Sequence, residues 1–258
     1  MTEEALVLHH RDERGVVTLT LNRPQAFNSL SEAMIDALHS ALHRVTEDDG
    51  ARVVVIAGAG KAFCAGHDLK EMRAEPSMGY YERLFERCGR MMLAIQHLPL
   101  PVIARVHGIA TAAGCQLVAS CDLAVAAREA RFAVSGVNLG LFCSTPSVAL
   151  SRNLARKQAF EMLVTGDFIS ADEALARGLV NRVAPAAELD AAVEALVGRI
   201  VGKPRAALAM GKQLFYRQLE VGIASAYHDA SRTMACNMMD ESALEGVQAF
   251  IDKRAPNW

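Results

Sequence analysis

The chain has 258 residues, 52% of them hydrophobic and 22% charged, a balance that is typical of a globular protein with a substantial core. The net charge of −2 gives no basic field for nucleic acid. Six scattered cysteines form no C-x-x-C pair, which argues against a zinc site or a redox dithiol. Residues 1–4 are acidic, unlike a targeting peptide, so we expect a cytoplasmic protein.

The first half of the chain alternates predicted strands and helices. Apolar runs predict strands at residues 6–8, 16–21, 53–57, 102–106 and 123–126. Helical spacing of apolar residues predicts helices from Ser31, over 81–95 and through Leu117. Residues 108–127 raise the question of a membrane span, but Gln116 and Asp122 interrupt them. A buried helix followed by a buried strand is the better interpretation.

The second half is predicted to be helical. Thr145 and Pro146 predict a helix start that opens residues 147–154. Ser170 to Glu173 has the form of a capping box, and Gly178 stands where that short helix should end. Helical periodicity continues over residues 189–201, 204–219, 223–239 and 243–253. We therefore expect an α/β core at residues 1–200 and a helical oligomerisation region at residues 201–258.

The turn after the strand at residues 53–57 is the candidate site. Gly58 and Gly60 are best interpreted as a structural turn, because the third glycine of a dinucleotide-binding fingerprint is replaced by Phe63. Ala65 and Gly66 leave the next stretch of backbone unobstructed, so that N–H groups there can point at a ligand. Such donors suit an oxyanion that develops during a reaction. The small residues 110–114, after another buried strand, offer a second donor.

Several motifs follow one another along the chain. They are Asn22-Arg23-Pro24 with Asn28-Ser29-Leu30, residues 61–69, residues 101–108, residues 114–117 with Cys121-Asp122, and residues 250–254. In this order and spacing the chain resembles the enoyl-CoA hydratase/isomerase (crotonase) superfamily over essentially its whole length. The resemblance implies an α/β fold, a crotonase-like spiral of ββα units with a helical C-terminal trimerisation region.

The resemblance also implies an enzyme, a lyase whose substrate is a coenzyme A thioester, with no further cofactor and no metal. It places two oxyanion-hole N–H groups on His67 and Ala113, the second near a helix N-terminus whose dipole favours negative charge. The implied partners are the acyl-CoA substrate and copies of the chain, as a homotrimer or dimer of trimers, without nucleic acid or membrane. The implied substrate-binding residues are Ala26, Phe27, Ala65, Gly66, Asp68, Leu69, Lys70, Gly114, Phe250 and Lys253, the last two reaching a neighbouring subunit's coenzyme.

Three positions depart from the family's hydratase pattern. Gln25 stands where many members carry a lysine. Hydratases of the family use two glutamates, and here those positions are Gln116 and Gly136, neither of which can act as a base. General acid–base assistance is worth on the order of 10²–10⁴-fold, so hydration should be slow unless another group substitutes. The candidates are the His67 side chain, Asp68, Cys143 and Ser144.

Two of these candidates have a plainer interpretation. Asp68 is more simply a helix N-cap, and Cys143 a buried structural thiol. The His67 side chain remains open as a catalytic group, because it starts at the oxyanion site itself.

Alternative reactions also remain open. His67, together with residues 137–140, resembles the decarboxylase branch that acts on malonyl-type coenzyme A esters, although that branch carries a tyrosine where this chain has Cys143. Loss of carbon dioxide generates the enolate directly, so no carboxylate base is required. Residues 142–146, with His67 and Gln116, resemble still more the enoyl-CoA hydratase domain-containing group, whose reaction the resemblance does not settle. A non-catalytic acyl-CoA binder is the third alternative.

Overall fold

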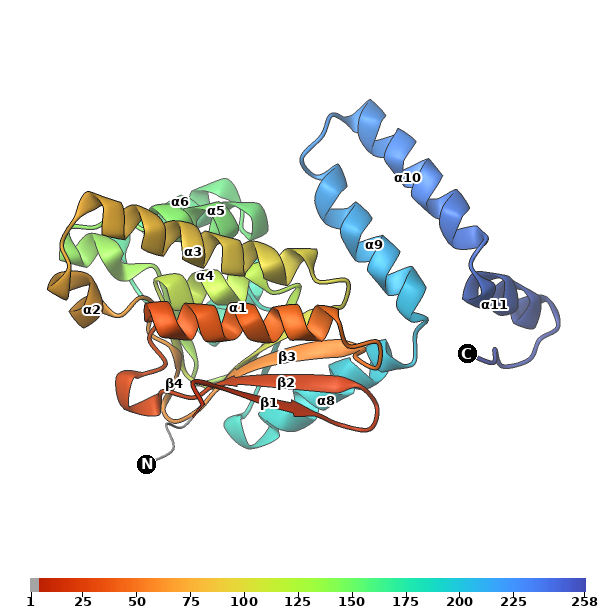
Figure 1. Cartoon of the computed structure of the whole chain (residues 1–258), viewed down its shortest axis with the longest axis horizontal. Coiled ribbons are helices and arrows are strands. Elements are labelled where there is room, and N and C mark those ends of the chain that lie inside the picture. Colours follow the sequence, from red (N-terminus) through yellow and green to blue (C-terminus); the bar gives the residue numbers. More distant parts are fainter. Residues whose placement is uncertain (1–4) are drawn as a thin grey trace.

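Two sheets form the centre of the computed structural model, which describes residues 5–258 (Figure 1). The larger sheet has the order β1 (Val7–Arg11), β2 (Val16–Leu21), β3 (Val53–Gly58), β5 (Val102–Val106), β7 (Leu123–Ala127) and β10 (Arg182–Ala184). Within this larger sheet the β1–β2 pair is antiparallel and the other pairs are parallel. The smaller sheet has the order β4 (Ala62–Cys64), β6 (Ile109–Thr111), β8 (Arg131–Ala133) and β9 (Ile169–Ser170).

The strands repeat one unit. In β3–β4, β5–β6 and β7–β8, the first strand joins the larger sheet and the second joins the smaller one. Helices follow each pair: α2 (Leu69–Ala74) and α3 (Met78–His97), then α4 (Ala113–Ser120), then α5 (Ser144–Asn153) and α6 (Arg156–Thr165). The predicted α/β architecture is therefore confirmed.

Burial explains why the strand patterns are so apolar. In β3, Val54 and Ile56 belong to the main core, which also includes buried faces of α1 (Glu32–Thr46), α3 and α4. Val53 and Val55 face the other way, into a second cluster with α8 (Leu189–Val201). Because helices cover both faces, the strand can be apolar at every position.

The apolar stretch at residues 108–127 holds β6, α4 and β7, and every residue of α4 is buried. The interpretation as a buried helix and strand is confirmed. Within residues 5–258, no helix has the length and apolarity that a membrane span requires.

Helix ends test the capping predictions. The capping box at Ser170 and Glu173 is present, and Gly178, at φ +86°, ends α7 (Ala171–Arg177) as predicted. The start predicted for helix α5, at Thr145 and Pro146, is wrong. Helix α5 begins at Ser144, and its N-cap is Cys143. The Ser147 N–H already donates to the Cys143 carbonyl at 2.9 Å. Pro146 therefore lies in the first turn, where its missing N–H has no intrahelical acceptor to lose.

The C-terminal helices α9 (Arg205–Gln218), α10 (Ile223–Met238) and α11 (Glu241–Ile251) extend away from the core as an arm (Figure 1). Lys212, the only buried residue of α9, anchors the arm: its Nζ donates to the carbonyls of Ile95 (2.8 Å) and Leu100 (2.9 Å) and to Asp122 Oδ2 (2.6 Å). The Tyr216 hydroxyl donates to Asp122 Oδ1 at 2.7 Å. The proposed boundary between residues 200 and 201 falls at the last turn of α8.

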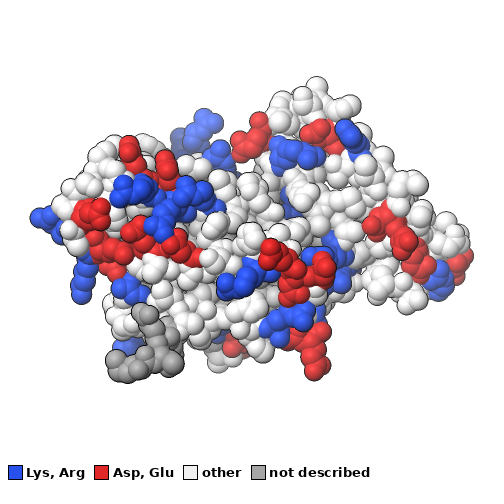
Figure 2. All heavy atoms as spheres, in the orientation of Figure 1, with Lys and Arg blue, Asp and Glu red and all other residues white. Residues whose placement is uncertain are grey.

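The surface of the arm is unusually apolar. Its exposed large side chains include Phe215, Ile223, Tyr227, Met234, Met239 and Phe250. On the core face seen in Figure 2, by contrast, basic and acidic side chains are interspersed, without a field of one sign.

Candidate functional site

The first turn of the candidate site follows β4. Gly66 has φ +89°, and its carbonyl accepts a hydrogen bond from the Leu30 N–H at 2.7 Å. The Asp68 N–H in turn donates to the Leu30 carbonyl at 3.2 Å, so His67 forms an isolated parallel bridge with Leu30. In such a bridge the residue between the two bonds directs its own N–H to the opposite side. Among residues 5–258 the His67 N–H has no protein acceptor.

The second turn follows β6. Ala112 donates its N–H to the Ala133 carbonyl at 2.9 Å and adopts φ +50°, a region that favours glycine. Helix α4 then begins at Ala113 without a side-chain cap. The Ala113 N–H has no acceptor within the described part of the chain, and it lies at the positive end of the helix dipole.

The two turns touch backbone to backbone. Strands β4 and β6 are hydrogen-bonded neighbours. A Cβ added to Gly66 would lie 3.2 Å from the Ala113 nitrogen, and one added to Gly114 would lie 2.1 Å from the Cys64 carbonyl oxygen. Glycine at positions 66 and 114 therefore lets the two segments approach, and it brings the amides of His67 and Ala113 onto adjacent turns.

The His67 ring is neutral and held by packing. It lies edge-on to Phe85, with the ring centroids 5.3 Å apart and an interplanar angle of 75°. Burial lowers the pKa of the imidazole to about 4. Its Nε2 is buried and finds no hydrogen-bond partner among residues 5–258. At neutral pH this side chain thus offers an uncharged ring to the site.

Asp68 caps α2, as its plainer interpretation predicted. Its Oδ1 accepts from the N–H groups of Lys70 (3.0 Å) and Glu71 (3.3 Å), and Arg23 donates to its Oδ2 at 2.6 Å. Burial alone would raise the pKa of this carboxyl, but the hydrogen bonds from Arg23 and the two amides outweigh it, and the pKa is lowered. The carboxylate is therefore committed to structure. The Arg23–Asp68 pair itself was not predicted.

Asn28 is a second residue whose role the sequence did not reveal. It is fully buried at φ +54°, and its Nδ2 donates to the carbonyls of Ala59 and Ala62, each at 2.8 Å. Its Oδ1 accepts from the Arg23 N–H at 2.9 Å. Asn28 thus fixes the segment that contains Ala26 and Phe27 against the β3–β4 turn. The only available signal was an asparagine, which tolerates the left-handed region, within a short motif.

The implied contacts near this segment lie together. The Phe27 carbonyl accepts from the Ala65 N–H at 3.0 Å, and Phe27 itself is 54% exposed. Leu69 and Lys70 open α2 directly after the first turn, and both are exposed. Ala26, Phe27, Ala65, Leu69 and Lys70 therefore surround one edge of the site.

The positions of the absent glutamates differ from each other. Gln116 lies on α4, is only 4% exposed, and its Oε1 has no partner in the described chain. Gly136 has no room for any side chain, because an added Cβ would lie 2.4 Å from the Leu141 carbonyl oxygen and 2.8 Å from Cys143 Sγ. The backbone has closed over the place where the second carboxylate would stand.

The Cys143 side chain fills part of the space beside Gly136. Its Sγ accepts a hydrogen bond from the Gly136 N–H at 3.3 Å, and burial raises the pKa of the thiol. These contacts support a structural thiol. Ser144 is exposed and donates to the Phe142 carbonyl at 3.4 Å.

A hydroxyl pair beside Gly136 was not predicted. Thr111 Oγ1 and Ser135 Oγ lie 3.0 Å apart and join the end of β6 to the short 3-10 helix at Ser135–Leu139.

Phe250 and Lys253 are not brought to the two turns. They lie at the end of α11, on the distal part of the arm (Figure 1), and Phe250 is 85% exposed. Any contact with coenzyme at the site would come from another copy of the chain. Within residues 5–258, no cluster of three or more metal-binding side chains is present.

Comparison with known proteins gives consistent matches. A family model described as enoyl-CoA hydratase/isomerase matches residues 11–258. Enoyl-CoA hydratase domain-containing protein 3, mitochondrial, from Rattus norvegicus is 43% identical over 96% of this chain and 83% of its own length. A putative enoyl-CoA hydratase from Thermus thermophilus is 34% identical over 95% of this chain and 98% of its own length.

Solved structures agree. The crystal structure of an enoyl-CoA hydratase from Mycobacterium smegmatis is 72% identical, with a TM-score of 0.98 over 99% of each chain. That of human enoyl Coenzyme A hydratase domain-containing protein 3 is 43% identical, with a TM-score of 0.94 over 98% of this chain and 100% of its own.

These matches correct one expectation. The domain-containing relatives from rat, mouse, Xenopus laevis and human are all named mitochondrial. These names contradict the expected cytoplasmic location and point to mitochondria for the relatives. Two glutamates near position 1 do not establish a compartment.

Proposed function

The chain belongs to the enoyl-CoA hydratase/isomerase family, and on this basis we propose that it binds an acyl-coenzyme A thioester and stabilises its enolate. The carbonyl oxygen accepts hydrogen bonds from the main-chain N–H groups of His67 and Ala113. One observation carries the proposal: both amides lack a protein acceptor among residues 5–258, and Gly66 brings their turns into contact.

The chemistry follows from where charge develops. When the thioester becomes an enolate, negative charge moves onto its oxygen, and fixed donors aimed there lower the barrier. One such donor is worth roughly 2.7–4 kcal/mol in a water-excluded site. The dipole of α4 adds to this at Ala113. The His67 ring is neutral at neutral pH, so it adds no positive charge beside the developing oxyanion.

We assign the protein to the lyase-type members of the family, and its hydration of enoyl-CoA should be slow. Water addition needs a group that removes a proton from water, and Gln116 is neutral while Gly136 has no side chain. Asp68 is held by Arg23 and two amides, so it does not substitute.

A second candidate is decarboxylation of a malonyl-type acyl-CoA. The neutral side chain of Gln116, which is only 4% exposed, favours it, because no carboxylate there repels an anionic acyl group. The carbon–carbon bond to the carboxylate breaks, its electron pair enters the enolate, carbon dioxide leaves, and the α-carbon then takes a proton from water. This path uses the two amides and no carboxylate base. A non-catalytic acyl-CoA binder is the remaining alternative.

We further propose that the chain works as a homotrimer or dimer of trimers, with the arm as the contact region. The exposed apolar side chains of α9, α10 and α11 support this. In such an assembly Phe250 and Lys253 reach the coenzyme of a neighbouring subunit.

One panel separates the three functions. The purified chain is assayed with a short 2-enoyl-CoA, with methylmalonyl-CoA, and for binding of acetyl-CoA. Turnover of methylmalonyl-CoA supports decarboxylation, and binding without turnover supports the non-catalytic alternative. Hydration at rates usual for the family would refute the view that the missing carboxylates limit water activation.

A single variant refines the hydration test. Gln116→Glu restores one carboxylate at a position that already holds a buried side chain of nearly the same shape. Its Gly136→Glu counterpart is not useful, because the Leu141 carbonyl occupies the space. Hydration should rise in Gln116→Glu, and an unchanged rate would mean that another defect limits the reaction.

A further inference from the structure

Lys253 has a strained backbone at the end of α11. It is left-handed, at φ +56°. The Arg254 N–H donates to the Ala249 carbonyl at 3.0 Å, and the Lys253 N–H donates to the Phe250 carbonyl at 3.2 Å. This pair of bonds is the Schellman ending of a helix, in which the left-handed position normally belongs to glycine. A lysine there is disfavoured unless its surroundings hold it.

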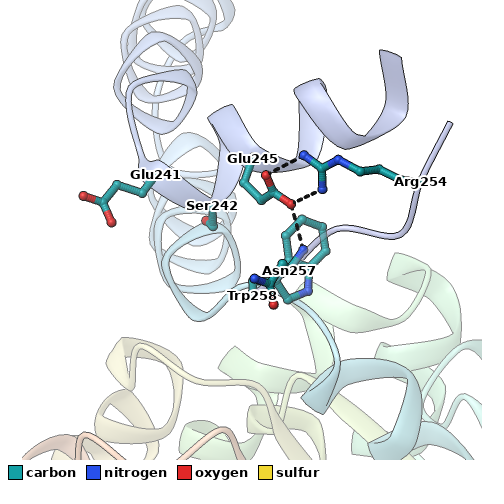
Figure 3. A pocket seen from close by; sticks show the side chains of 6 residues that line it. All are labelled: Glu241, Ser242, Glu245, Arg254, Asn257 and Trp258. Atoms are coloured by element: carbon teal, nitrogen blue, oxygen red, sulfur yellow. Dashed lines mark hydrogen bonds and ion pairs between the residues drawn. The ribbon is translucent and has the colours of Figure 1, made fainter. Parts of the chain in front are cut away.

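Hydrogen bonds between Glu245 and the residues after Lys253 stabilise this conformation. Glu245, one and a half turns before Phe250 on α11, receives two hydrogen bonds from Arg254, Nη1 to Oε1 at 2.6 Å and Nη2 to Oε2 at 3.0 Å. The Asn257 N–H donates to the same carboxylate at 2.8 Å (Figure 3). Hydrogen bonds from Arg254 and from Asn257 lower the pKa of Glu245 to about 2, so the pair is fully ionised.

Trp258 ties the same segment to the core. Its indole Nε1 donates to the Gly202 carbonyl at 3.1 Å, just after α8. A Cβ added to Gly246 would lie 2.9 Å from Trp258 Cζ3, so the indole rests where α11 has no side chain. A hollow of about 590 Å³ beside it is lined by Glu241, Ser242, Glu245, Arg254, Asn257 and Trp258 (Figure 3). Glu245, Arg254, Asn257 and Trp258 are called the C-terminal clasp below.

We propose that the C-terminal clasp is a positioning device that locks Lys253 in its left-handed conformation and thereby aims its ammonium group at a phosphate of the coenzyme. The inference rests on the proposed function, in which Lys253 meets the coenzyme of a neighbouring subunit. Arg254, the other cation of this segment, is occupied by Glu245 and does not compete for the phosphate. Trp258 sets the position of α11 against the α8 end, and the Glu245–Arg254 pair sets the backbone on both sides of Lys253.

The test compares two ligands by calorimetry on the full chain. Acetyl-CoA carries the adenosine phosphates, and S-acetylpantetheine has the same thioester without them. Glu245→Gln releases the clasp, so Lys253 leaves the left-handed region most of the time and acetyl-CoA should bind roughly tenfold more weakly. S-acetylpantetheine should bind as before. Glu241→Gln is the matched control, because Glu241 lines the same hollow and makes no hydrogen bond in the clasp.

Two further readouts separate positioning from simple stability. Lys253→Gly removes the strain and the ammonium together, so its melting temperature should rise while acetyl-CoA binding weakens. Trp258 is the only tryptophan of the sequence, so its fluorescence reports directly on the clasp. Acrylamide should quench it more strongly in Glu245→Gln than in the unchanged protein. Trp258→Phe keeps an aromatic ring over Gly246 and loses only the bond to Gly202, and it should weaken acetyl-CoA selectively as well.

The outcomes are distinguishable. If the unchanged chain binds acetyl-CoA and both Glu245→Gln and Trp258→Phe bind it equally tightly, the inference is overturned and the proposed function stands. Equal losses for both ligands would also overturn it, since they indicate a general structural effect. If the unchanged chain binds neither ligand, the proposed function fails, and the inference fails with it.

Discussion

The two turns of the candidate site begin alike and end differently. Each follows a short strand of the smaller sheet and leads into a helix, α2 after Gly66-His67 and α4 after Ala112. In the first turn a glycine takes the positive φ, and the Asp68 carboxylate caps the first amides of α2. In the second turn an alanine takes the positive φ, and no side chain caps α4.

The difference shows how amides are kept available for a ligand. At the capped turn the Asp68 carboxylate accepts from the Lys70 and Glu71 amides, whereas the His67 N–H has no acceptor among residues 5–258. At the uncapped turn the helix terminus itself faces the site, and the strained Ala112 directs it there. In the proposed function, the capped turn holds the backbone in place on one side of the thioester carbonyl, and the uncapped helix terminus stabilises negative charge on the other side.

Gly66→Ala should have the largest effect, because it separates the two turns. The new methyl group meets Ala112 Cβ at 2.9 Å, and φ +89° is unfavourable for alanine. Strain and overpacking together should lower the free energy of unfolding by about 2–5 kcal/mol, measured by urea denaturation. Gly89→Ala is the control: it lies within α3 with no atom in its way, and it should stabilise the protein. Equal stability of the two variants would show that the turns need no close approach.

Ala113→Pro removes one amide donor from the uncapped turn. Position 113 is the first residue of α4, where proline keeps the helix intact. Turnover with the best substrate of the panel should fall by about 10²–10³-fold, since one oxyanion donor is lost. Ala112→Gly, which only relieves the positive φ, should retain turnover. A fully active, folded Ala113→Pro protein would remove Ala113 from the mechanism.

Asp68→Ala tests the capped turn. Loss of the cap should lower the free energy of unfolding by about 0.5–2 kcal/mol at neutral pH. Because the folded pKa of Asp68 lies below its ordinary value of 3.8, its contribution is present above that pH and is lost as pH falls through the lowered pKa. The difference between Asp68→Ala and the unchanged chain should therefore shrink in strong acid. A difference independent of pH would mean that the carboxylate is not stabilised by its partners.

His67 should have the smallest effect at neutral pH. Because burial lowers its pKa to about 4, the folded protein leaves the ring neutral where the unfolded chain, near 6.5, already binds a proton. The unfolded chain is therefore favoured by proton binding below pH 6.5, so the free energy of unfolding is highest above pH 6.5 and decreases as the pH drops toward 4. His67→Gln should remove this part of the acid sensitivity, seen in urea midpoints between pH 7 and 4. Acetyl-CoA binding should show no step near pH 6.5.

Much of the fold could be predicted from the sequence, because the patterns that determine it involve residues close together in the chain. Residues 53–57 are apolar throughout, and residues 102–106 are apolar except for Arg105, since helices cover both faces of their sheet. The capping box at Ser170 and the turn at Gly66 were readable for the same reason: one or two side chains decide them.

What the sequence could not supply depends on contacts between distant residues. Asn28 binds carbonyls more than thirty positions away, and Arg23 pairs with Asp68 across forty-five. The closed backbone at Gly136 arises from Leu141 and Cys143 folding back, which no periodicity encodes. Ala112 looks like an ordinary small residue, and only its φ reveals the strain.

The direct test of the two converging amides is the infrared carbonyl band of bound acetyl-CoA, labelled with carbon-13 at the thioester. Two hydrogen bonds from His67 and Ala113 polarise that bond, so the band should move to lower frequency on binding and should move less in Ala113→Pro. A band that stays at its solution frequency while acetyl-CoA is bound would contradict the account.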